Sequence, residues 1–159
     1  MKKLVLSVFA VCAFAFTSNA QEGFNVGASV GLPMGDAGDF ASFNITLDAN
    51  YLFEVSDKFD AGIATGFNHS IAKEDWFDDM QFIPVAGAAR FMATEKVMLG
   101  ADLGYALGMN EGNDGGFYYR PMAGYNVSEK LQVNLSYIGV AIENVSWNTI
   151  NLGASFNIN

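Results

Sequence analysis

The sequence has few of the residues that build disulfides, metal sites or basic binding surfaces. Its 159 residues include one Cys, one His and three Pro, with eight Lys and Arg against 17 Asp and Glu. One thiol and one imidazole exclude a disulfide framework and a tetrahedral zinc site. The formal charge of −9 argues against affinity for nucleic acid or anionic lipid surfaces. No apolar run reaches the ~20 residues of a membrane-spanning helix.

The first twenty residues have the pattern of an export signal. Lys2 and Lys3 precede a short apolar run that a single serine interrupts. Ser18 and Ala20 then place small residues at the −3 and −1 positions of a signal-peptidase site. We expect cleavage after Ala20, which leaves 21–159 as one domain without cysteine. That domain owes its stability to something other than disulfides.

From residue 24 onward, apolar residues alternate with small or polar ones. A period of two is typical of strands with one apolar face. Soluble strands average ~5–6 residues, whereas strands that cross a bilayer need ~9–11. The runs found here are about 10–13 residues long, which favours a membrane barrel. Eight such runs occur, at 24–34, 43–55, 59–69, 80–93, 97–109, 116–127, 131–142 and 148–158.

The connections between these runs alternate in length. Outer-membrane barrels typically have short turns on one side of the membrane and longer loops on the other. Here both termini lie on the side of the short, charged turns. A soluble antiparallel meander with three chance hairpin turns is the alternative. The short turns lie at 56–58, 94–96 and 128–130, and the longer acidic connections lie near 35–42, 70–79, 110–115 and 143–147.

The polar face of the runs distinguishes a membrane barrel from a soluble one. A soluble lipocalin-like barrel points apolar residues inward and needs a charged exterior. Here the polar face is mostly Gly, Ser, Asn and Ala, while charge concentrates in the turns and loops. We therefore predict that the apolar face meets lipid and the small polar face lines a narrow lumen.

Together, the export signal, the eight alternating strands, the short turns and the cysteine-free mature region resemble the small eight-stranded outer-membrane β-barrels. That family includes the barrel domain of outer-membrane protein A and outer-membrane proteins X and W. The expected fold is an all-β, eight-stranded antiparallel up-and-down transmembrane β-barrel.

The resemblance also implies a location and a role. It implies the outer membrane of a Gram-negative bacterium, with loops outside and turns in the periplasm, among outer-membrane lipid and lipopolysaccharide. It implies insertion by the barrel-assembly machinery and a role in envelope integrity or surface interaction, without enzyme activity or cofactor. We expect a monomer that does not bind nucleic acid. A narrow porin-like channel for small solutes is the alternative function.

Four ionisable residues share the inward phase at membrane depth: Asp48, Arg90, Asp102 and Arg120. Buried charges persist where they are paired. Folding the fourth run onto the fifth places Arg90 opposite Gly100, one diagonal step from Asp102, and Arg120 can lean toward the same carboxylate. We predict a lumen salt-bridge network that fills the barrel. A selectivity constriction in a narrow pore is the alternative.

His69 and Ser70 lie together at the loop-side end of the third run. Some eight-stranded outer-membrane enzymes that modify lipids place a His, a Ser and a carboxylate at about this height. Activation of a serine needs the imidazole within hydrogen-bond reach. Because adjacent residues of a strand point to opposite faces, we predict a polar strand end and no catalytic pair.

The second of the longer loops is rich in carboxylates. Its acidic residues flank Trp76 and Phe77, which are placed to touch a membrane interface or a partner. Oxygen-rich sites suit Ca²⁺, but the spacing is not that of an EF-hand. We predict a solvated acidic surface loop; binding of Ca²⁺, or a bridge to lipopolysaccharide through divalent cations, is the alternative. The acidic residues are Glu74, Asp75, Asp78 and Asp79.

Pro84 and Pro121 fall inside predicted strands, where each removes one donor from the hydrogen-bond ladder. A closed barrel has no edge strand that tolerates this loss. We therefore expect bulges or frayed ends at both prolines.

Overall fold

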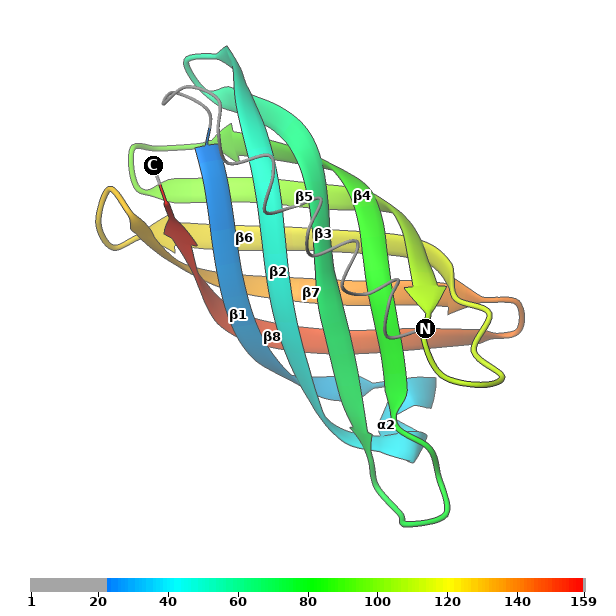
Figure 1. Cartoon of the computed structure of the whole chain (residues 1–159). Helices are drawn as coiled ribbons and strands as arrows, with labels where there is room; N and C mark the ends of the chain where they lie inside the picture. The colour runs from blue at the N-terminus through cyan, green and yellow to red at the C-terminus, as the bar shows by residue number, and fades with distance from the viewer. Residues whose placement is uncertain (1–22, 159) are drawn as a thin grey trace.

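Eight antiparallel strands close into a barrel in the computed structural model, which describes residues 23–158 (Figure 1). Each strand pairs with the next along the chain, and β8 pairs with β1, so no sheet edge is left open. The predicted signal segment at 1–20 lies outside the described residues. The elements are β1 (Gly23–Met34), α2 (Asp36–Phe40), β2 (Ala41–Ser56), β3 (Phe59–Ala72), β4 (Met80–Met92), β5 (Val97–Gly108), β6 (Gly116–Asn126), β7 (Leu131–Ile142) and β8 (Val145–Asn157).

The predicted fold class is confirmed, and the period-two pattern explains it. In β5, Leu99, Leu103 and Leu107 point outward, and Leu103 is 57% exposed. Asp102 and Ala106 lie between them in the chain and are buried in the interior. The other strands repeat this arrangement, because alternate side chains of a strand point to opposite faces.

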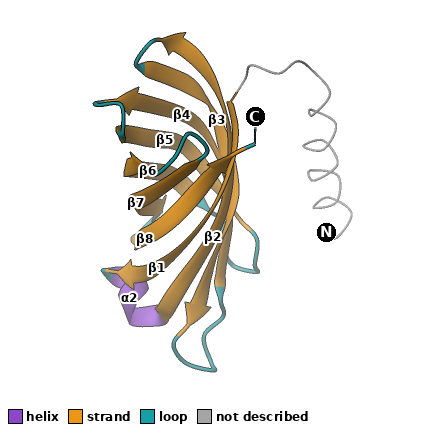
Figure 2. Cartoon of the chain, turned by 90° about the vertical axis from the view of Figure 1, so that its left-hand side faces the viewer, coloured by secondary structure: helices purple, strands orange, loops and turns teal. Residues whose placement is uncertain are grey.

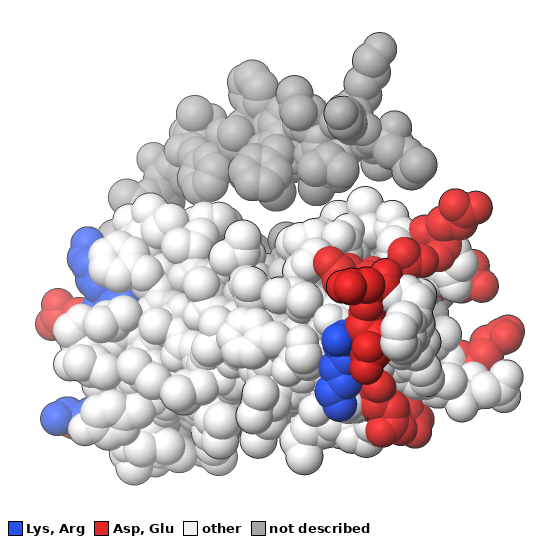
Figure 3. Space-filling model, turned by 90° about the horizontal axis from the view of Figure 1, so that it is seen from below, with Lys and Arg blue, Asp and Glu red and all other residues white. Residues whose placement is uncertain are grey.

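An uncharged belt surrounds the barrel. Figure 3 shows this belt between one end with scattered charges and a second end where carboxylates gather. Rings lie on its outer face near the strand ends, as in the stacked row of Phe117, Tyr119 and Tyr137, with neighbouring centroids 6.3 and 6.2 Å apart. Rings at this level suit the headgroup region of a bilayer. Within residues 23–158, no helix is long and apolar enough to cross a membrane.

Two of the expected loops differ from the prediction. The segment 143–147 is not a long connection, because β7 and β8 meet in a tight hairpin in which Ile142 pairs with Val145. The sequence pattern missed this strand start because Val145 and Trp147 share the inward phase of β8, opposite to that of the outward Leu152. In the first loop, the chain turns at Gly35, whose φ of 58° suits glycine, and then forms the short helix α2. Figure 2 shows α2 at one end of the barrel beside β1.

The expected bulges at the prolines are wrong. Around Pro121, the pairing of β6 with β7 stops after Tyr119 and resumes at Met122 in the same register. On its other side, Pro121 pairs normally with Ala101 of β5. Pro84 behaves in the same way between β3 and β5. Since proline lacks only the N–H, one neighbouring strand loses a bond while the other ladder maintains the register.

A charge on the outer belt tests whether this face meets lipid. Leu103→Arg at the middle of β5 is expected to lower the free energy of unfolding by about 2–4 kcal/mol in lipid vesicles. Leu131→Arg at the end of β7 is the matched control, with an expected loss of about 1 kcal/mol or less. The barrel is unfolded with denaturant, and the folded fraction is measured on gels, where the folded barrel migrates differently from the boiled one. Equal losses at the two positions would contradict a lipid-facing belt.

Candidate functional site

The interior of the barrel has three layers along its axis. An apolar layer lies at the loop-side end, ion pairs and amide groups occupy the middle, and a polar cup opens at the end that carries the short turns. Eight-stranded barrels are narrow enough for side chains to fill them. The layers therefore decide whether anything passes through or binds inside.

The loop-side layer is a hydrophobic core inside the lumen. The fully buried Ala37 of α2 packs against it and caps the barrel end. Trp147 of β8 belongs to this layer, and its indole Nε1 donates to Ser70 Oγ at 3.0 Å. This layer was not expected from the sequence, although continuing the β7 alternation past Tyr137 places Ile138 and Val140 inside the barrel. The buried members are Ala37, Ala41, Phe82, Ala86, Ala106, Tyr118, Ile138, Val140 and Trp147.

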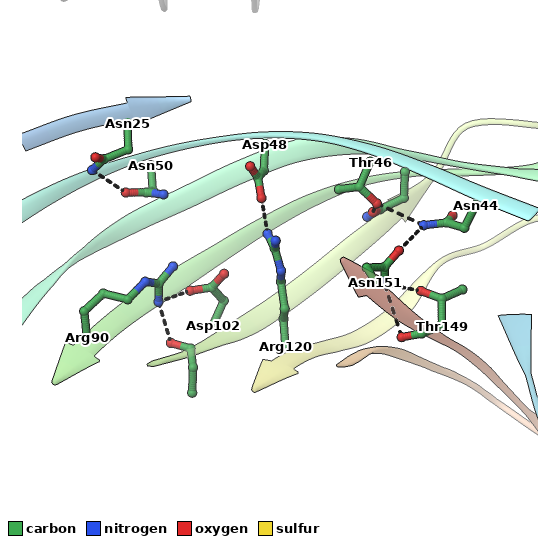
Figure 4. A network of polar contacts seen from close by, with 12 residues as sticks. Asn25, Asn44, Thr46, Asp48, Asn50, Arg90, Asp102, Arg120, Thr149 and Asn151 are labelled. Carbon is green, nitrogen blue, oxygen red and sulfur yellow. Dashed lines mark hydrogen bonds and ion pairs between the residues drawn. The ribbon is translucent and has the colours of Figure 1, made fainter. Parts of the chain in front are cut away.

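The four predicted lumen charges all lie inside the barrel, where they form two ion pairs (Figure 4). Arg90 Nη1 lies 2.6 Å from Asp102 Oδ1 and also donates to the carbonyl oxygens of Ala89 and Ala101. Arg120 pairs with Asp48 of β2, although Asp102 is its direct register neighbour on β5. Asp102 is already bound to Arg90, and the long Arg120 side chain spans the narrow lumen to the strand opposite. The expected lean of Arg120 toward Asp102 is therefore replaced by a bond across the barrel.

Amide and hydroxyl groups form a second connection across the middle layer (Figure 4). Asn44 Nδ2 donates to Asn151 Oδ1 at 2.8 Å, which joins β2 to β8. Thr46 Oγ1 donates to Asn68 Oδ1 at 2.7 Å, which joins β2 to β3. These residues are buried, so their hydrogen bonds offset the loss of water. Their role could not be predicted from the sequence, because short polar residues are common on any lumen face.

The middle layer leaves almost no free space. A cavity of about 10 Å³ lies among Asp48, Thr65, Asp102, Tyr118 and Arg120. That volume holds roughly one water molecule. Below it, the cup at the turn side has a volume of about 720 Å³. The space among the middle-layer side chains is therefore much smaller than the space at the turn side.

His69 and Ser70 point to opposite faces of β3. Ser70 is buried in the lumen and donates to Asn44 Oδ1 at 2.9 Å. His69 lies on the outer rim, where Nε2 is 3.1 Å from Asp79 Oδ2 and Nδ1 is 3.1 Å from Gln81 Nε2. The imidazole and the hydroxyl do not form the hydrogen bond that a nucleophile and its base require.

The acidic loop between β3 and β4 is tied to the barrel rim. Asp79 Oδ1 accepts from the backbone N–H of Ala72 at 2.8 Å, and its other oxygen pairs with His69. Phe77 packs edge-on against Phe40 with ring centroids 5.2 Å apart, whereas Trp76 is 77% exposed. Within residues 23–158, no three His, Cys, Asp or Glu side chains gather closely enough to hold a metal ion.

Comparison with known proteins gives a family match along nearly the whole chain. A family described as "Outer membrane protein beta-barrel domain" matches residues 4–157. A search of curated proteins finds no relative by sequence.

Among solved structures, the chain is similar to Ail, the attachment invasion locus protein of Yersinia pestis, with a TM-score of 0.57 and 16% identity over 86% of this chain and 97% of that one. It is similar to Neisserial surface protein A, with a TM-score of 0.54 and 16% identity over 86% and 97% of the two chains. It is also similar to the N-terminal β-barrel domain of Pseudomonas aeruginosa OprF, with a TM-score of 0.53 and 14% identity over 88% and 100%. At these identities the likeness shows the fold.

Removing one partner of a lumen ion pair tests its role in stability. Asp102→Asn leaves the buried Arg90 guanidinium without a counter-charge, which is expected to cost about 3–5 kcal/mol of unfolding free energy. The double variant Arg90→Met with Asp102→Asn removes both charges and is expected to recover most of that loss. Urea unfolding of the refolded barrel measures both. A single variant as stable as the parent chain would show that the pair contributes little.

Cysteine labelling tests the layers of the lumen, since the chain has no cysteine after residue 12. Ser155→Cys in the cup is expected to react quickly with a water-soluble maleimide in the folded barrel. Val140→Cys in the apolar layer is expected to react only after unfolding, because Val140 is buried. Mass spectrometry measures both rates. Fast labelling at position 140 in the folded state would contradict a dry loop-side layer.

Proposed function

Because the chain belongs to the outer membrane protein beta-barrel domain family, we propose that it is an integral outer-membrane protein with a closed lumen, acting through the parts that project from the membrane. In this proposal it serves envelope integrity or surface interaction and carries out no enzymatic reaction. It is exported by its signal segment, inserted by the barrel-assembly machinery and surrounded by outer-membrane lipid and lipopolysaccharide as a monomer.

The layered interior is the observation that supports a closed lumen. A solute that entered from the cup would meet the ion pairs Arg90–Asp102 and Asp48–Arg120 and then the apolar layer under α2. Separating a buried pair leaves two charges without solvent or partner, which costs several kcal/mol. An ion would also lose its water in the apolar layer, where the Trp147 indole N–H is already bound to Ser70.

The charge of the loop-side end supports a role at the surface. Lys73 is the only Lys or Arg in the four loop-side connections, and it is bound to the carbonyl oxygens of α2. Such a face attracts divalent cations and positively charged partners and repels polyanions. Trp76 beside it offers a large apolar contact to whatever docks there. The loop-side carboxylates are those of Asp36, Asp39, Glu74, Asp75, Asp78, Asp79, Glu111, Asp114 and Glu143.

Conductance across a planar bilayer tests this function. The purified and refolded barrel is expected to give no current steps, with insertion shown separately by gel migration and protease protection. Discrete steps that change in Arg90→Ala or Arg120→Ala would overturn the closed lumen and favour the narrow channel for small solutes. The matched control is Lys58→Ala, which removes a cation from a turn and leaves the lumen unchanged.

A further inference from the structure

The turn-side cup is a cavity that the barrel does not fill with its own side chains. Its volume of about 720 Å³ lies within the range of roughly 300–1,000 Å³ found for small-molecule sites. The loop-side half of the same lumen is packed, so this cavity belongs to the turn-side half of the barrel. We propose that this cup binds a small zwitterion, an amino acid or short peptide, with its carboxylate at Arg90 and its ammonium group at Glu54 and Asp60.

The floor of the cup offers donors for a carboxylate. Arg90 lines the cavity and is only 6% exposed. Its hydrogen bonds to the described part of the chain are all donated by Nη1, to Ala89, Ala101 and Asp102. Nε and Nη2 are left for a ligand. Figure 4 shows one nitrogen turned to Asp102, with Asn25 and Asn50 at the same end of the view. A guanidinium edge with two free donors matches the two oxygens of a carboxylate.

The wall of the cup offers acceptors for an ammonium group. Glu54 of β2 and Asp60 of β3 are direct cross-strand partners, and both line the cavity. Neither forms an ion pair with another residue in 23–158. Like charges placed opposite each other on neighbouring strands are destabilising. An ammonium group between them would relieve this repulsion. Asp60 is also the register partner of Arg90, so the two subsites are neighbours.

The remaining lining favours a molecule with both charges over an ion of one sign. Three cations, Arg90, Lys96 and Lys130, face four carboxylates in the cup. The carboxylates are those of Glu54, Asp60, Glu95 and Glu129. Arg90 is also paired with Asp102, so Lys96 and Lys130 only partly balance these carboxylates. The separated positive and negative subsites attract a dipolar ligand.

Amide side chains complete the cup and suit peptide groups. Asn25 Nδ2 donates to Asn50 Oδ1 at 3.0 Å, and Asn157 Nδ2 donates to Asn25 Oδ1 at 3.1 Å. This chain of amides joins β8, β1 and β2 along the wall of the cup. Amide groups offer both donors and acceptors, which suit the backbone of a short peptide. The location of the cup on the periplasmic side rests on the proposed function. Binding of the zwitterion does not depend on how the barrel is oriented in the membrane.

The test is an NMR titration of the whole refolded barrel in detergent micelles with alanine and trialanine. Saturable shifts are expected at cup residues, and N-acetyl-trialanine amide, which lacks both charges, is expected to bind at least about tenfold more weakly. The smaller zwitterion alanine shows whether a free amino acid is enough. Equal binding of the capped peptide, or no saturable shift in the cup with either zwitterion, would overturn the proposal.

Two carboxylate variants locate the ammonium subsite. Asp60→Asn is expected to weaken trialanine binding several-fold. Because the substitution relieves the repulsion with Glu54, the barrel is expected to stay folded. Asp57→Asn is the matched control, because Asp57 belongs to the same β2–β3 hairpin and does not line the cup. An equal effect of both variants would overturn the assignment. A barrel that binds trialanine and also conducts ions would contradict the proposed closed lumen. The binding site in the cup would still be supported.

Discussion

A strand that crosses a bilayer must bond all its backbone polar groups to protein, because the hydrocarbon offers no partner. In this chain the pairing of β8 with β1 meets that requirement by removing the last free edge. Closure at eight strands also determines the width of the lumen, so every inward side chain faces another across a short distance. The ion pairs, the amide chains and the apolar layer are all consequences of this narrow interior.

The narrow interior is filled unevenly. The loop-side half carries bulky apolar residues such as Phe82 and Trp147 and is capped by α2. The middle holds the charges in pairs, with Arg120 joined to Asp48 across the barrel. The turn-side half is lined by amides, hydroxyls and charged side chains and stays open. The same fold therefore combines a packed half with a polar cup.

The outer parts of the molecule differ in charge as well as in length. The turns carry both signs, whereas the loop-side end is almost entirely acidic and includes the exposed Trp76. The loop that presents Trp76 is held by the bonds of Asp79 to Ala72 and His69. A surface that is ordered in this way loses little entropy when a partner binds.

The sequence by itself determined the number of strands, most of their ends and the face that each side chain takes, because alternation in a strand is a local property. It therefore placed Asp48, Arg90, Asp102 and Arg120 inside. Only the closed barrel decided that Arg120 reaches Asp48, since that contact depends on which strands face each other after closure. The apolar layer, the hairpin at Val145 and the open cup were likewise decided by tertiary packing. Their residues belong to different strands, and no period in the sequence records the distance across the lumen.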